Sequence, residues 1–385
     1  MTQGSLPDNY VGREQAFVKH SILKTYIERL FMIVCMNKAN IVNFVDCFSG
    51  PWQEGDEELS DTSIGISLKQ MDRCRGVLKH KFKREVKFRA LYIEKDPEAF
   101  AKLEQFLANS PYKDIETACI NADYSEVTDE IVNWCGGHFS FLFLDPKGWD
   151  IGLSKVAPLL EMPDCEFLIN LMYDSINRFV TVDVQEEKMI DIFGEIPDFE
   201  FDDARSRHIT LVDLCRDNLN TAFGGRTAYV NVEQPGKDRV LYNLIYLTRH
   251  ARGLEVFKTE AEKLDIVQRV TQMETKLRQQ QAVNGMGDLF GHGREVAELT
   301  IEDNRNQAKN HIIDILSAGP TKIDLEMWAD WLEKTDLYPR DFQLAMKELV
   351  KEKVVINQNA NVRRRTKNII VPDYLNKCET WALVT

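Results

Sequence analysis

The sequence predicts an α/β protein with a doubly wound, mostly parallel, Rossmann-like sheet, followed by a smaller domain. Short apolar runs alternate with helical stretches, and an acidic or turn residue stands near the end of each run. Strands that alternate with helices favour a parallel sheet. Strands that are apolar along most of their length favour a sheet covered on both faces. The runs occupy residues 40–52, 88–97, 115–124, 139–149 and 165–173.

Local patterns define the rest of this domain. Apolar residues recur at helical spacing over residues 14–37, which predicts a helix that leads into the first strand. Two further β-like runs, 227–234 and 240–250, flank a turn-forming Gln-Pro-Gly-Lys-Asp sequence. We interpret them as an antiparallel hairpin that closes the far edge of the sheet. The mainly helical stretch 180–225 is expected to form an insertion over the face that receives a substrate.

The C-terminal part has a different organisation. Residues 279–293 are rich in Gln and Gly without periodicity, which is typical of a linker. Three helical patterns then precede two β-like runs, a combination that predicts a winged helix. The runs are residues 354–360 and 365–374. We therefore expect an α/β domain over residues 1–278 with its helical insertion near 180–225, a linker over 279–297, and a winged-helix-like domain over 298–385.

Composition limits the class of protein. No apolar run reaches the roughly 20 residues of a membrane helix, and the N-terminal residues have no apolar core typical of a signal peptide. The eight cysteines are scattered singly, without zinc spacing. These features predict a cytoplasmic protein with free thiols and neither a membrane nor a metal as partner. The net charge of −13 means that any contact with nucleic acid would use local basic patches.

Acidic residues stand at the carboxyl ends of the predicted strands, where open α/β sheets bind their ligands. Asp46 ends the first run, and Phe48 and Gly50 follow in the same loop. Glu94 ends the second run, where a carboxylate can accept hydrogen bonds from two ribose hydroxyls, and Asp123 follows the third, suited to an adenine amino group. A Gly-x-Gly-x-x-Gly fingerprint is missing, so the pattern fits S-adenosyl-L-methionine (SAM) better than a dinucleotide. The alternative for each acid alone is a solvated strand end.

The fourth run ends in Asp145-Pro146-Lys147-Gly148-Trp149. Amino-methyltransferases that act on bases use Asp/Asn-Pro-Pro-aromatic, in which the side chain and the next carbonyl accept hydrogen bonds from the target amine. Asp145 and Pro146 would serve this catalytic role. Lys147 replaces the second proline and is either a phosphate contact or a solvated lysine. Trp149 supplies an aromatic ring one position late.

Three residues near or after the end of the fifth run are candidates for the acceptor pocket: Asn170, Tyr173 and Arg178. Helix capping and packing explain them almost as well.

Several segments together resemble the three-Cys-motif partner proteins. They are FVKHSILKTYIERL, NFVDCFSGPW, FLFLDPKGW, LINLMYDSINRF and LYNLIYLTRHARGLEVFK, with the winged-helix-like tail. The resemblance implies a class I SAM-dependent methyltransferase fold and a separately encoded, three-cysteine partner that resembles radical-SAM enzymes. It places Asp46 and Gly50 in the cofactor loop, Asp145, Pro146 and Gly148 in the fourth-strand motif, and Lys19 and His20 in the signature of the N-terminal helix. The chain departs from the family's Gly-Pro-Gly loop at Trp52 and in the acidic tract that follows.

Two basic patches interrupt the acidic background. Residues 79–87 precede the second run, and residues 362–367 would form the tip of the wing, with Arg363, Arg364 and Arg365 at its centre. A basic wing is typical of contact with a nucleic-acid backbone. The alternatives are a protein-binding wing and a solvated lysine-rich helix.

The sequence therefore predicts a SAM-dependent methyltransferase-like protein that acts on DNA or RNA, preferentially on an amine, with a radical-SAM-like partner. The alternative is a catalytically inactive adaptor with the same fold, which Trp52 and the imperfect fourth-strand motif favour. The acids at four strand ends argue against the adaptor. A metal enzyme is disfavoured, because no histidine or extra carboxylate completes a site around Asp46, Glu94 and Asp145.

Overall fold

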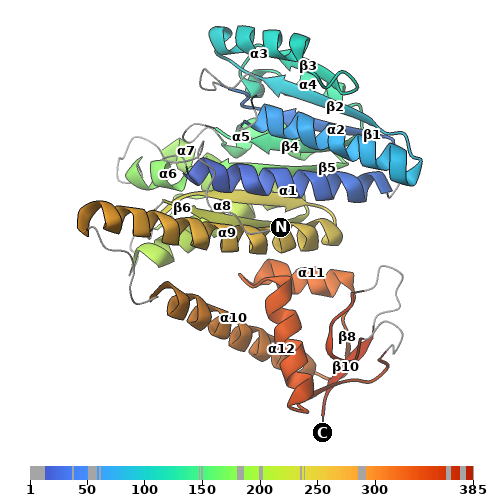
Figure 1. Cartoon of the computed structure of the whole chain (residues 1–385), viewed down its shortest axis with the longest axis vertical. Coiled ribbons are helices and arrows are strands. Elements are labelled where there is room, and N and C mark those ends of the chain that lie inside the picture. The colour runs from blue at the N-terminus through green and yellow to red at the C-terminus, as the bar shows by residue number, and fades with distance from the viewer. Residues whose placement is uncertain are drawn as a thin grey trace. The chain divides into compact units, whose positions relative to one another are not determined.

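The chain folds into two compact units, Met1–Arg249 and His250–Thr385, in the computed structural model (Figure 1). The structure describes residues 14–36, 39–50, 59, 62–146, 148, 151–179, 186–198, 203–234, 236–237, 239–284, 292–360, 366–372 and 379–384. Trp52, Lys147, Trp149, Arg363, Arg364 and Arg365 lie outside these residues, as does the side chain of Arg178.

The first unit is built on a seven-stranded sheet with the order β3-β2-β1-β4-β5-β7-β6. The strands β1 to β5 are parallel to their neighbours, whereas β7 is antiparallel to both β5 and β6. The strands are β1 Ile41–Asp46, β2 Lys87–Ile93, β3 Glu116–Ile120, β4 Phe139–Leu144, β5 Cys165–Leu171, β6 Arg226–Glu233 and β7 Val240–Thr248. The predicted fold class is confirmed, with the antiparallel hairpin at the far edge.

The central strands are apolar on both sides because helices cover both faces of the sheet. All residues of β4 and β5 are buried, as are five of the six residues of β1. The helices of this unit are α1 Glu14–Met36, α2 Ser63–Phe82, α3 Pro97–Asn109, α4 Thr128–Cys135, α5 Leu153–Leu160, α6 Tyr173–Phe179, α7 Glu186–Phe193 and α8 Ala204–Phe223, with a short 3-10 helix η2 Tyr124–Glu126.

One face of the sheet packs aromatic side chains under α1 and α2, which lie in front of the strands in Figure 1. The ring of Tyr26 on α1 lies 5.8 Å from that of Phe141 on β4. The Tyr26 hydroxyl donates to Glu166 Oε2 at 2.8 Å, and Thr248 Oγ1 donates to Glu166 Oε1 at 2.8 Å. The buried carboxylate of Glu166 is thus hydrogen-bonded at both oxygens, as a buried charge requires, and it ties α1 to β5 and β7.

The opposite face holds an aliphatic core beneath α4, α5 and α8. Leu211, Val212 and Cys215 of α8 are buried in it, together with Phe167 of β5 and Leu247 of β7. The helical content predicted for residues 180–225 is present as α7 and α8. Helix α8 packs on the sheet as part of this layer, since a helix with an apolar face is stabilised by burying it. The predicted insertion over a substrate face stays a prediction.

Side-chain hydrogen bonds at helix ends connect α5, α7 and α8. Asp191 of α7 accepts hydrogen bonds from Ser154 N at 2.7 Å and from Ser154 Oγ at 2.8 Å, so it caps the N-terminus of α5. A Cβ at Gly152 would lie 1.7 Å from Asp191 Oδ2, so only glycine leaves room for this carboxylate. Asn218 of α8 in turn donates to the carbonyls of Asp191 and Ile192 at the end of α7.

The second unit contains four helices and a three-stranded antiparallel sheet of order β8-β10-β9 within its described residues. Its core is aromatic, with Trp328, Trp331 and Phe342 packed on one another. The elements are α9 Ala251–Asn284, α10 His292–Ser317, β8 Thr321–Lys322, α11 Leu325–Lys334, α12 Pro339–Lys351, β9 Val355–Asn357, the 3-10 helix η3 Thr366–Asn368 and β10 Thr380–Leu383. The winged-helix assignment stays a prediction.

The strand pairing in this unit differs from the sequence prediction. The partner of β9 is β10, and the described part of the predicted partner 365–374, residues 366–372, contains η3. The apolar Ile370 is buried, but Gln343 of α12 binds its backbone, donating to the Ile370 carbonyl at 2.7 Å and accepting from its N–H at 2.9 Å. A side chain therefore satisfies the backbone groups that the prediction gave to a strand partner.

The division between the units also differs from the expected boundaries. It falls before α9, whereas the sequence analysis places the boundary at residue 278. Helix α9 extends to Asn284 and α10 begins at His292, so both ends of the predicted linker 279–297 are helical. No helix among the described residues is long and apolar enough to cross a membrane.

Replacement of Asp191 by Ala is expected to destabilise the first unit. It removes the cap of α5, and loss of a capping side chain costs about 0.5–2 kcal/mol. Urea unfolding, with hydrogen exchange over residues 153–160, measures the effect. Asp191→Asn should restore part of the stability, and Glu187→Ala, an exposed change on the same helix, should have little effect. Equal stability of Asp191→Ala and the wild type would show that the cap contributes nothing.

Candidate functional site

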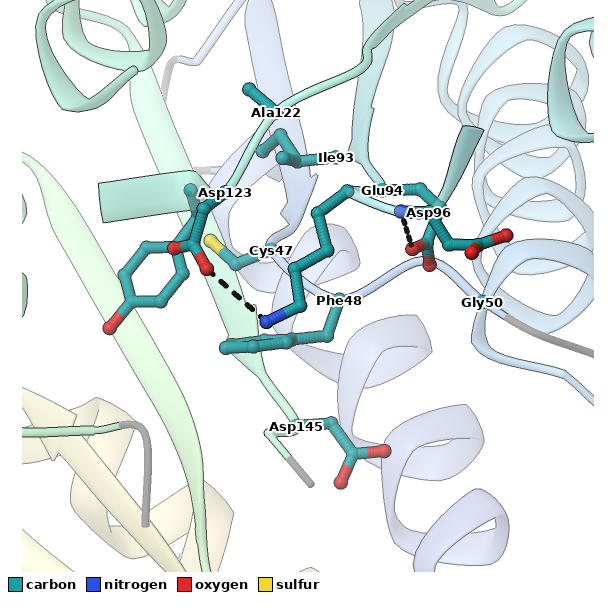
Figure 2. A pocket seen from close by; sticks show the side chains of 11 residues that line it. Cys47, Phe48, Gly50, Ile93, Glu94, Asp96, Ala122, Asp123 and Asp145 are labelled. Carbon is teal, nitrogen blue, oxygen red and sulfur yellow. Dashed lines mark hydrogen bonds and ion pairs between the residues drawn. The ribbon is translucent and has the colours of Figure 1, made fainter. Parts of the chain in front are cut away.

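A cavity of about 260 Å³ opens at the carboxyl ends of β1, β2, β3 and β4. Its volume is close to the lower end, about 300 Å³, of the range for ligand pockets. Five of the predicted site residues line it together: Phe48, Gly50, Glu94, Asp123 and Asp145. These residues come from four strand ends, so the sheet has gathered side chains that are far apart in the sequence (Figure 2).

The cavity lies where the strand order reverses. The chain runs outward from β1 through β2 to β3, and returns to place β4 on the other side of β1. At such a point the loops after the two central strands leave in opposite directions and open a crevice. The position of the cavity is therefore a consequence of topology.

The sequence predicts that Asp46 contacts the cofactor, but this residue does not lie at the surface of the cavity. Its carboxylate is fully buried behind the loop and does not line the cavity. Oδ2 accepts from Ser63 Oγ at 2.6 Å, and Oδ1 accepts from Phe48 N at 3.0 Å. Asp46 thus joins the loop after β1 to the first residue of α2. Any influence on a ligand would act through the loop.

The loop after β1 approaches β2 closely at Gly50. A Cβ at this position would lie 2.7 Å from Glu94 Oε2, so the glycine allows the carboxylate to face the cavity. Glu94 Oε1 accepts from Asp96 N at 2.7 Å, which fixes the side chain. Among the described residues, no hydrogen bond is made to Glu94 Oε2. The loop and the strand end together present one fixed carboxylate oxygen to a ligand.

Asp123 is held at the opposite wall. Oδ1 accepts from Ser125 Oγ at 2.8 Å, and Oδ2 lies 3.4 Å from Lys95 Nζ. Burial works to raise the pKa of Asp123, but the hydrogen bonds of Ser125 and the charge of Lys95 outweigh it and lower the pKa. The carboxylate is therefore ionised at neutral pH.

Asp145 lies apart from Glu94 and Asp123, with Phe48 between them in the view of Figure 2. Its carboxylate forms an ion pair with Lys19 of α1, and Oδ1 accepts from Asn170 Nδ2 at 2.6 Å. Burial would raise the pKa of Asp145, but the charge and hydrogen bond of Lys19, with the hydrogen bond from Asn170, lower it. A predicted fourth-strand residue and a predicted fifth-strand residue thus meet a residue of the N-terminal helix.

Tyr173 does not reach this cavity. It is buried, and its ring stands edge-on to His208 of α8 at 4.6 Å between centroids. The packing explanation therefore fits Tyr173. Pro146 is buried directly after Asp145.

The sequence analysis did not select six lining residues: Cys47, Ile93, Lys95, Asp96, Ala122 and Tyr124. Each lies within two residues of a selected one, so proximity to a strand end was the available signal. The side chains of Ile93, Ala122, Tyr124 and Phe48 give the cavity apolar walls. Apolar walls with a few fixed polar groups are suited to a nucleoside-like ligand. Among the described residues, no group of three His, Cys, Asp or Glu side chains is arranged to hold a metal ion.

Comparisons with known proteins give weak likenesses. No protein-family sequence description and no curated protein matches the chain. Among solved structures, the methyltransferase domain of the bacterial protein CtHen1-CN is 8% identical, with a TM-score of 0.31, over 60% of this chain and 99% of that one. A loganic acid methyltransferase with SAH is 8% identical, with a TM-score of 0.28, over 72% of this chain and 92% of that one. The doubly wound fold is established by the strand order and by the antiparallel β7, not by these likenesses.

Ionisation of Asp46 is expected to reduce stability near neutral pH. Burial raises the pKa of Asp46 from 3.8 to about 6. Between pH 4 and 6 the folded protein retains a proton here that the unfolded chain has lost, so the stability contribution of Asp46 falls as pH rises. This rise in the pKa of Asp46 corresponds to a loss of about 3 kcal/mol in the free energy of unfolding at neutral pH.

Asp46→Asn isolates this effect, because an amide keeps a polar group at both positions and cannot ionise. Relative to the wild type, the variant should gain stability progressively from pH 4 to 7, as measured by thermal melting at each pH. Asp217→Asn, at an exposed site on α8, is the control. A difference between Asp46→Asn and wild type that stays constant with pH would show that Asp46 titrates normally.

Proposed function

We propose that this protein binds SAM in the cavity and transfers its methyl group to an amine of a nucleic acid. The observation that carries the proposal is the convergence of Glu94, Asp123 and Asp145 on one cavity at the point where the strand order reverses. Open α/β sheets bind ligands at this point. A solvated strand end explains one acid, but not three that face the same cavity.

The residues present fit the adenosine part of SAM. Glu94 Oε2 faces the cavity past Gly50, with no Cβ in the way, and is suited to accept from ribose hydroxyls. The ionised carboxylate of Asp123 is suited to the amino group of adenine. The apolar walls around Phe48 suit the face of the base. Glu94 and Asp123 would thus fix the ends of the nucleoside.

Bound SAM would supply an activated methyl group on a sulfonium. The residues of this chain have only to align an acceptor with it, so no covalent intermediate with the protein is expected. A carboxylate has about four lone-pair positions, and Lys19 and Asn170 account for two of those on Asp145. Asp145 therefore retains capacity to accept from a target amine, together with the carbonyl of Pro146.

The choice of nucleic acid and of a partner rests on the sequence. The resemblance to three-Cys-motif partner proteins supports a radical-SAM-like partner, and the basic residues 362–367 support contact with DNA or RNA. The amine is favoured by the Asp-Pro pair after β4.

The second candidate is a methyltransferase-fold adaptor without activity. The engagement of both Asp145 oxygens by Lys19 and Asn170 favours it, because a structural ion pair needs no acceptor. In that case the first unit would serve to recruit the partner or the nucleic acid.

Replacement of Glu94 by Gln is expected to weaken binding of S-adenosylhomocysteine by about 10- to 100-fold. The amide oxygen can still accept from Asp96 N, but an NH2 group replaces the carboxylate oxygen that faces the cavity. Hydrogen bonds to charged groups contribute about 1.5–3 kcal/mol, and each 1.4 kcal/mol is tenfold in Kd. Isothermal titration calorimetry gives both dissociation constants.

The matched control is Glu98→Gln, an exposed glutamate in the first turn of α3, which should bind as the wild type does. If the wild type binds neither SAM nor S-adenosylhomocysteine, even with the partner added, the adaptor replaces the enzyme as the leading function. If it binds, incorporation of radiolabelled methyl groups into DNA or RNA separates a transferase from an adaptor that only binds the cofactor.

A further inference from the structure

We propose that the ion pair between Lys19 and Asp145 recognises the amino-acid tail of the ligand, with the ammonium on Asp145 and the carboxylate on Lys19. The inference rests on the proposed function, since it concerns the same cavity. It gives a ligand-binding role to α1, a helix that otherwise covers the sheet. An α-amino acid carries one charge of each sign, and this ion pair presents the complement of both. Lys19 and Asn170 leave about two lone-pair positions on Asp145, so one can accept from the ammonium and the other from the target amine of the proposed function.

The position of the pair fits this role. Asp145 lines the cavity away from the end where Glu94 and Asp123 would hold the nucleoside (Figure 2). Lys19 is not among the described residues that line the cavity, but its Nζ is hydrogen-bonded to Asp145 Oδ2 and its side chain is 18% exposed, so a ligand at Asp145 has Lys19 beside it. At such a site, charge interactions are stronger than on an open surface.

Asn170 provides independent evidence that a donor is missing here. It is 2% exposed, and its Nδ2 donates to Asp145 Oδ1. This hydrogen bond fixes the orientation of the amide, because the opposite orientation would place an oxygen against the carboxylate. Among the described residues, the buried Asn170 Oδ1 then has no hydrogen-bond partner. An unsatisfied buried acceptor costs about 1–3 kcal/mol, and an ammonium bound at Asp145 has three N–H donors, one of which suits this oxygen.

Lys19 is held by a rigid element. Helix α1 is anchored by the hydrogen bond of Tyr26 to Glu166 and by that of Tyr242, whose hydroxyl donates to the Gln15 carbonyl at 2.7 Å. Sites on packed helices and strands hold their groups more accurately than loops do. An ammonium also has three donors, so Lys19 can keep Asp145 and bind a carboxylate at the same time.

The ligand that tests this proposal differs from S-adenosylhomocysteine only in the tail. 5′-Methylthioadenosine keeps the adenosine and the sulfur but lacks the amino-acid group. Calorimetry with both ligands gives the preference for the tail as a ratio of dissociation constants. The variants are Lys19→Met, which keeps the length of the side chain, and Asp145→Asn, which keeps its shape. Lys24→Met, an exposed change on the same helix, is the matched control.

The wild type and Lys24→Met should prefer S-adenosylhomocysteine, and Lys19→Met and Asp145→Asn should each reduce this preference about tenfold or more. Binding of 5′-methylthioadenosine should stay within about twofold in both, which shows that the cavity is folded. Lys19→Arg should keep most of the preference, because the positive charge remains.

An undiminished preference in Lys19→Met and Asp145→Asn would overturn this inference while leaving the proposed function intact. An equal loss of affinity for both ligands in these variants would also overturn it. The ion pair would then stabilise the fold and would not recognise the amino-acid tail. Failure of the wild type to bind either ligand would overturn the proposed function itself, and the inference with it.

Discussion

The reversal of strand order between β1 and β4 is the constraint on which the rest of the structure depends. A parallel sheet places the carboxyl ends of its strands at one edge, and the reversal separates the two central loops. Glu94 and Asp123 lie on one side of this point and Asp145 on the other. Because helices cover both faces of the sheet, a ligand has access at this edge. The sheet therefore determines where the chemistry of this chain can take place.

Acidic residues at equivalent strand ends have different roles. Their burial and their partners in the folded chain determine which role each one has. Asp46 is enclosed by Ser63 and the loop, and burial raises its pKa. Asp145 is paired with Lys19, which lowers its pKa. The first carboxyl organises the loop, whereas the second remains charged beside the cavity. The position of an acid in the sequence does not distinguish these roles, because the distinction depends on the partners that folding supplies.

The sequence predicts correctly those features that local interactions determine, and it misses those that depend on contacts between residues far apart in the chain. The strands β1 to β5 are predictable because an apolar run bounded by turn residues is a local signal. The pairing of β9 with β10 is not predictable in this way, since residues 365–374 also contain an apolar run. The backbone of Ile370 is bound by Gln343, a side chain distant in the sequence. The roles of Lys19 and Asn170 likewise depend on contacts across the fold. Sequence resemblance marks Lys19 and Asp145 separately, but not the ion pair between them.

The contacts of Asp145 also bear on whether this fold is a site or a scaffold. Buried ion pairs are often no more stabilising than apolar side chains of similar volume. The Asn170 oxygen, which has no partner among the described residues, adds a cost. A core selected for stability alone would have little use for Lys19, Asp145 and Asn170 at this edge. The three groups become favourable together when a ligand supplies the missing donor, because the ammonium satisfies Asn170 and shares the charge of Asp145. The unsatisfied acceptor beside a charged, cavity-lining carboxylate is therefore better explained by a binding site than by a scaffold.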